Sequence, residues 1–199
     1  MQRALLLLLI VGALGAQATS ASAQARGPRL HAGVGFALDF GGDVEFDDRS
    51  DIDLDPTVGL RGHLDYAVHR HVSVGGLARL SWWEPDAPFG QDRSFLFDLG
   101  PRVIGHFDYR DFRFYSGLSL GVTISVLNDD WATFDNPGVG PTLTVTVVGA
   151  EWWFGRRTGL FAELGWVGHW FEHDLELSNR EVDLSLSQGL FEFGLVFGG

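Results

Sequence analysis

The residues of this sequence best suited to acid–base chemistry are His169, Glu172, His173 and Asp174, which follow one another closely. A histidine beside a carboxylate can act as a general base held in place by its partner. Hydrolysis would also need a nucleophile, and no serine stands in a recognisable nucleophile setting nearby. We therefore predict no catalytic residues and no enzymatic activity, and a lipid-modifying enzyme is the last of three functional alternatives.

A second group of residues could bind cations through carboxylate oxygens. Its members are the five acidic residues Asp43, Glu45, Asp51, Asp53 and Asp55. The run D-I-D-L-D-P differs from an EF-hand loop, because Pro56 stands where that loop needs glycine and no glutamate closes it. We expect a solvated acidic surface, with a specific Ca²⁺ site as the alternative; its charge would be neutralised by divalent cations or by Arg49, Arg93 and Arg180. No resident cofactor or metal is predicted.

Six more charged or titratable residues are far apart in the sequence but share one pattern. They are Arg61, His63, Arg79, Arg102, Glu163 and Glu192. Each alternates with the large apolar residues around it. In a strand, all six side chains would therefore point to the face opposite the apolar one. Buried charges are tolerable only when they are paired. We predict one interior cluster, at similar depth, in which each glutamate pairs with one or more of the three arginines.

The fold that could bring these residues together is indicated by residues 112–127, F-R-F-Y-S-G-L-S-L-G-V-T-I-S-V-L. Apart from Ser116, large apolar side chains hold one parity from Phe112 to Val126, and mostly small, polar or charged ones hold the other, which is the period of a strand. This strand is longer than a soluble sheet usually needs. It suits a tilted crossing of the ~30 Å hydrocarbon layer, which takes about 9–11 residues.

The same alternation recurs along the chain. It predicts strands at residues 30–46, 52–68, 72–82, 95–107, 112–127, 142–154, 160–169 and 182–197. Long and short connections alternate between them. The sequence therefore predicts an all-β fold, an eight-stranded antiparallel up-and-down transmembrane β-barrel with short turns and both termini in the periplasm. The first two strands are expected to form one long hairpin that projects beyond the membrane.

Three places bear on the regularity of the alternation. Glu151 falls on the apolar parity unless Gly149 carries a bulge or the glutamate lies at the membrane interface. In the last strand, the apolar residues up to Leu186 are expected to face outward, and the parity slips near Gly189, which we interpret as a bulge. In the first strand, the parity is expected to continue unbroken as far as Phe46.

Residues 1–23 have the layout of a secretory signal peptide: a charged head, an apolar run too short to span a membrane, and A-x-A sites that end at Ala23 and Ala25. We expect cleavage after residue 23 or 25, with residues 26–199 forming the barrel domain; a retained anchor helix is the alternative.

The chain has no cysteine, which excludes disulfides and a lipoprotein anchor. A formal net charge of −12 argues against nucleic acid as a partner.

The charged residues distinguish a membrane barrel from a soluble one, because soluble ligand-binding barrels place apolar side chains inside. Ten take the parity opposite the apolar face: Asp39, Arg61, His63, Asp65, Arg79, Asp98, Arg102, Arg113, Glu163 and Glu192. A lipid-facing arginine near the membrane midplane costs about 2–4 kcal/mol. Their exclusion from the apolar face predicts the cell outer membrane, with lipid or lipopolysaccharide around the barrel.

The chain resembles the small eight-stranded outer-membrane barrels that include the OmpA transmembrane domain, OmpX and OmpW. The resemblance covers Arg26 to Gly199 and rests on strand count, loop asymmetry, the stretch G-L-F-A-E-L-G-W at 159–166, and the final strand E-F-G-L-V-F. It implies the barrel assembly machinery as a partner that reads a terminal phenylalanine. Here Phe197 is followed by two glycines.

The predicted function is coarser than the predicted fold. Eight strands leave an interior just wide enough for side chains to fill it. The leading prediction is a non-enzymatic structural or surface-interaction protein whose acidic extracellular hairpins offer strand edges to partners. The runner-up is a narrow channel for small solutes, as the resemblance to OmpA would allow.

Overall fold

The computed structural model of this chain describes residues 29–46, 49–53, 55–83, 94–126, 138–175 and 180–198. The side chains of residues 43–53, 83, 94, 171–175 and 180–184 are not part of that description. The predicted signal peptide and its cleavage site lie outside the described residues.

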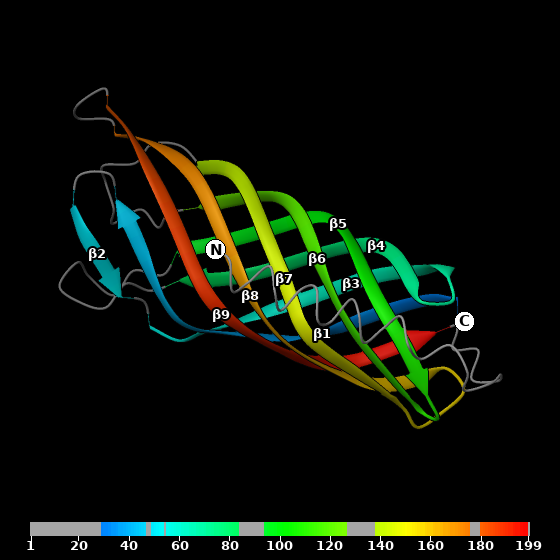
Figure 1. Cartoon of the computed structure of the whole chain (residues 1–199). Helices are drawn as coiled ribbons and strands as arrows, with labels where there is room; N and C mark the ends of the chain where they lie inside the picture. Colours follow the sequence, from blue (N-terminus) through cyan, green and yellow to red (C-terminus); the bar gives the residue numbers. More distant parts are fainter. Residues whose placement is uncertain are drawn as a thin grey trace, which may run out of the picture.

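Nine strands make up the described part of the chain (Figure 1). They are β1 Leu30–Phe46, β2 Arg49–Asp53, β3 Thr57–His69, β4 Val72–Trp83, β5 Ser94–Tyr109, β6 Phe112–Val126, β7 Gly138–Trp153, β8 Thr158–Leu175 and β9 Arg180–Gly198. The order in the sheet is β2-β1-β3-β4-β5-β6-β7-β8-β9, and β1 also pairs with β9. Eight strands therefore close into an antiparallel barrel, while β2 pairs only with the far end of β1. The predicted fold is confirmed.

All the short connections lie at one end of the barrel. They are the turns at residues 70–71, 110–111 and 154–157. Both ends of the described chain lie there as well, because the Ala67 amide donates to the Arg29 carbonyl and the Gly198 amide donates to the Arg157 carbonyl. We call this the short-turn end; β2 and the tips of β8 and β9 lie at the opposite end (Figure 1). No helix among the described residues is long and apolar enough to cross a membrane.

The barrel is apolar outside and polar inside. Large apolar side chains such as Val34, Leu99 and Leu120 are exposed, the last of them by 57%. All ten charged or titratable residues predicted to face inward are buried. Since water would favour the reverse distribution, this arrangement suits a barrel surrounded by acyl chains.

A bulge in β1 corrects two predictions about parity. Phe40 pairs with Gly189 and Gly42 pairs with Gln188, so Gly41 is the extra residue, and its φ of 54° favours glycine. The pairing of β8 with β9 continues through Gly189 without a shift, so a bulge at that residue was wrong. Leu186 is 2% exposed and faces the lumen, contrary to the prediction. The unbroken parity predicted for the first strand fails for the same reason.

A second bulge lies in β7 and places Glu151 inside the barrel. Thr146 pairs with Gly165 and Val148 with Leu164, and both Val147 and Val148 are exposed. The extra residue reverses the parity of the rest of the strand, so Glu151 is buried. Of the two alternatives left by the sequence, a bulge and an interfacial glutamate, the bulge is present, but it lies one or two residues before Gly149.

Candidate functional site in the barrel lumen

The charged and titratable side chains of the lumen form three groups, which we call the inner, middle and outer tiers, counted from the short-turn end; all are buried except that of Asp108, which is 24% exposed. The inner tier comprises His31, His106, Asp108, Arg113 and Glu151. The middle tier comprises Arg61, His63, Asp65, Arg102, Glu163 and Glu192, and the outer tier comprises Asp39, Arg79, Asp98 and His169.

Glu163 is the centre of the middle tier. Its Oε1 accepts hydrogen bonds from Arg61 Nη2 at 2.8 Å and from Arg102 Nη2 at 2.6 Å. Tyr115 Oη donates to the same oxygen at 2.7 Å, and Thr146 Oγ1 donates to Oε2 at 2.8 Å. The donors come from β3, β5, β6 and β7, so one carboxylate on β8 ties together strands from across the barrel.

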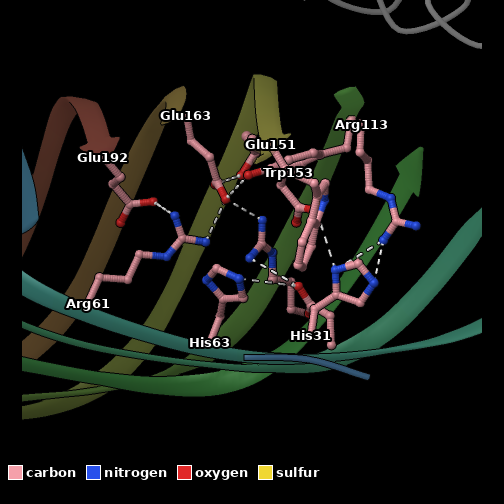
Figure 2. Close-up of polar contacts among 12 residues, drawn as sticks. His31, Arg61, His63, Arg113, Glu151, Trp153, Glu163 and Glu192 are labelled. Atoms are coloured by element: carbon pink, nitrogen blue, oxygen red, sulfur yellow. Dashed lines mark hydrogen bonds and ion pairs between the residues drawn. The ribbon is translucent and has the colours of Figure 1, made fainter. Parts of the chain in front are cut away.

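The remaining charges of the middle tier surround this centre. Arg61 also donates to Glu192 (Figure 2), and Arg102 Nη1 lies 3.4 Å from Asp65 Oδ2. The Arg61 guanidinium lies over the Phe161 ring, 5.2 Å from its centroid. His63 packs edge-on against the same ring and lies 3.9 Å from Asp65. Paired charges and aromatic rings therefore lie side by side at this level of the interior.

Gly149 makes room for the tyrosine that completes the middle tier. A Cβ atom at this position would lie 2.2 Å from Cε2 of the Tyr115 ring. We predict that Gly149→Ala displaces the ring from Glu163 and lowers the free energy of unfolding by about 1–3 kcal/mol, the usual cost of overpacking. Urea unfolding in lipid vesicles measures it. Gly62→Ala is the matched strand control, since its Cβ would meet only the Gly33 carbonyl oxygen, at 3.8 Å; an equal loss in both variants would contradict the prediction.

The outer tier contains Arg79, which the sequence had placed with the other two arginines. Arg79 instead donates to Asp98 at 2.9 Å and to Asp39 at 3.2 Å, and it forms no ion pair with either glutamate of the middle tier among the described residues. His169 Nε2 lies 3.1 Å from both Arg79 Nη2 and Asp98 Oδ2. Thr123 also donates to Asp98. This histidine, considered above for acid–base chemistry, is completely buried in the tier.

The inner tier was only partly anticipated by the sequence. Arg113 donates to both oxygens of Asp108, at 2.6 and 3.2 Å, and its Nη1 lies 2.6 Å from His31 Nε2. His31 Nδ1 lies 3.3 Å from Glu151, which also accepts from the Trp153 indole at 3.1 Å. Figure 2 shows these side chains converging from β1, β6 and β7. The inward parity of His31 was visible in the sequence, whereas an inward Glu151 depended on a bulge in β7 that the sequence left as one of two alternatives.

Each tier has one carboxylate more than its arginines and at least one histidine. The middle tier has three carboxylates and two arginines, and each of the other tiers has two carboxylates and one arginine. In every tier a histidine nitrogen lies within 4 Å of a carboxylate oxygen. The charges of the lumen are thus nearly balanced within each of the three tiers.

The acidic group near the long hairpin is described through its backbone. Asp43 and Asp53 stand opposite each other in the pairing of β1 with β2. The side chains of Asp43, Glu45, Asp51 and Asp53 lie outside the described part of the chain, and Asp55 is exposed. Among the described residues, no group of histidine and acidic side chains could hold a metal ion. Divalent cations at this hairpin stay a prediction.

The comparisons with known proteins support the fold. No protein-family profile and no curated protein sequence matches the chain. The outer membrane protein OprG of Pseudomonas aeruginosa matches with a TM-score of 0.53 and 12% identity, over 86% of this chain and 95% of that one. Neisserial surface protein A matches with a TM-score of 0.54 and 11% identity, over 85% and 97%. The chain has the fold of the small eight-stranded outer-membrane β-barrels.

Proposed function

We propose that the chain is a non-enzymatic barrel of the outer membrane, with a closed lumen and with long hairpins that meet its surroundings. The location is supported by the apolar outer surface, which is unfavourable in water and suited to lipid. The absence of enzymatic activity is supported by His169, which is sealed between Arg79 and Asp98 instead of facing an accessible surface.

The proposal of a closed lumen is supported chiefly by the contacts of Glu163. Its contacts with Arg61, Arg102, Tyr115 and Thr146 cross the interior from four other strands. An eight-stranded barrel has little room beyond its own side chains. A network of this kind therefore serves to hold the wall together and to fill its centre.

The surface-interaction role is supported by the long hairpin. β1 continues to Phe46, where it pairs with β2 on one side and with β9 on the other. Among the described strands, β2 pairs with β1 alone, so within this part of the chain its second edge carries unpaired backbone groups. An edge of this kind can accept an added strand from a partner.

A bilayer recording tests the closed lumen. We expect the purified protein to insert into a planar bilayer without adding steady conductance, because ion pairs close the lumen at the middle tier. Insertion is verified by recovering folded protein from the same lipid. Steady single-channel currents from the wild-type protein would overturn the closed lumen and favour a channel.

A narrow channel is the second candidate because several buried lumen atoms have no protein partner. Asp39 Oδ2, Arg61 Nε and Glu192 Oε1 form no hydrogen bond within the described part of the chain. Buried polar atoms of this kind usually bind water. Water in the outer and middle tiers would be the starting point of a conducting path, and the same recording decides whether that path is continuous.

A further inference from the structure

The arginines whose side chains the structure describes fall into two groups with opposite surroundings. The four in the lumen are buried and paired with carboxylates. Five others are exposed at the short-turn end and form no ion pair among the described residues; we call them the rim arginines: Arg29, Arg70, Arg110, Arg156 and Arg157. Asp111 is the exposed acidic residue of the same turns. The rim is therefore positive, although the whole chain carries a formal net charge of −12.

The rim arginines stand around the barrel instead of on one side. Arg29 precedes β1, Arg70 lies in the β3–β4 turn and Arg110 in the β5–β6 turn, while Arg156 and Arg157 lie in the β7–β8 turn. The Arg157 carbonyl accepts from Gly198 at the end of β9. Every short turn thus carries at least one arginine, and all of these arginines lie at the short-turn end of the barrel.

Exposed aromatic side chains lie directly beside this rim. Tyr109, Phe112, Trp152 and Phe154 face outward at the short-turn end, and Trp152 contacts both phenylalanines, with ring centroids 6.4 and 5.7 Å away. The Arg110 guanidinium lies over the Tyr109 ring, 5.3 Å from its centroid. Aromatic side chains of this kind favour the boundary between acyl chains and headgroups. The rim arginines therefore fall at the headgroup level.

Guanidinium is well matched to phosphate at that level. All fourteen basic residues of the sequence are arginine. The planar guanidinium can donate two parallel hydrogen bonds to a phosphate group, which an ammonium cannot do, and it is more weakly hydrated. At headgroup depth, the rim arginines, which form no ion pair among the described residues, are complementary to lipids that carry net negative charge.

We propose that the rim arginines bind the phosphodiester groups of anionic phospholipids in the leaflet at the short-turn end. The proposal rests on the membrane location proposed above. It assigns the two ends of the barrel different surroundings, since the sequence of the long hairpin is rich in acidic residues and the rim arginines lie at the opposite end. Attraction to an anionic headgroup near the membrane surface is worth roughly fivefold in binding per arginine.

The test uses the full mature chain in vesicles of phosphatidylcholine, with or without phosphatidylglycerol. Protein is extracted with its surrounding lipid, and the ratio of the two lipids around it is compared with that of the vesicle. We expect wild-type protein to enrich phosphatidylglycerol about fivefold. Combined replacement of all five rim arginines, Arg29, Arg70, Arg110, Arg156 and Arg157, by glutamine should remove the enrichment, and high salt should weaken it.

The matched control replaces Arg49, Arg93 and Arg180 by glutamine and should keep the enrichment. Equal uptake of both lipids by the wild-type protein, or loss of the enrichment in the control as much as in the rim variant, would overturn the proposal. Vesicle flotation is measured in parallel. Failure of the wild-type protein to float with either vesicle would contradict the membrane location itself, whereas floating without enrichment contradicts only the lipid preference.

Discussion

Replacing Glu163 with alanine should lower the free energy of unfolding by about 3–5 kcal/mol, the usual cost of removing one partner from a buried ion pair. The variant leaves Arg61 and Arg102 without their shared carboxylate and deprives Tyr115 and Thr146 of their acceptor. Glu192 and Asp65 still pair with the two arginines, so the barrel should fold at reduced stability. Equilibrium urea unfolding in phospholipid vesicles, followed by tryptophan fluorescence, measures the loss.

Two further variants separate charge from hydrogen bonding at this position. Glu163→Gln keeps an oxygen acceptor but removes the charge, so its loss should be smaller than that of Glu163→Ala. Asp111→Asn removes an exposed carboxylate at a short turn and should leave stability nearly unchanged. If Glu163→Ala behaved like Asp111→Asn, the middle tier would have no role in stability.

The direction of the lumen side chains could be predicted because a strand has a period of two. Arg61, Glu163 and Glu192 all oppose their apolar neighbours, and all are buried. The tier of each residue could not be predicted in the same way. Counting residues from the short-turn end ignores the tilt and stagger of the strands, which shift the depths of residues on different strands. Arg79 consequently joins Asp39 and Asp98 in the outer tier.

The bulges show a second limit of the sequence pattern. Gly189 looked like the site of the parity change in the last strand, yet the extra residue is Gly41 on the neighbouring strand. A bulge changes the pairing between two strands, and a single strand's pattern does not say which partner carries it. The bulge at Val147 and Val148 could not be located from the sequence either, because valine is common in strands whether its side chain points outward or inward.

The second large effect concerns the outer face of β6. Leu120 is 57% exposed and lies midway along the strand. We expect Leu120→Arg to lower the free energy of unfolding in a bilayer by about 2–4 kcal/mol, because a lipid-facing arginine near the midplane loses its hydration. Val126→Arg, on the same face at the end of the strand, should cost only about 0–1 kcal/mol near the interface.

This pair of substitutions tests the membrane-spanning arrangement most directly, because replacing an exposed leucine by arginine is costly in lipid and nearly neutral in water. The measurement is the difference in unfolding free energy between Leu120→Arg and Val126→Arg in the same vesicles. A barrel embedded in lipid predicts a clear penalty at Leu120 that fades toward Val126. If both variants stayed within about 0.5 kcal/mol of the wild type, as surface substitutions in water do, the outer face would be solvated, which would contradict a membrane-spanning barrel.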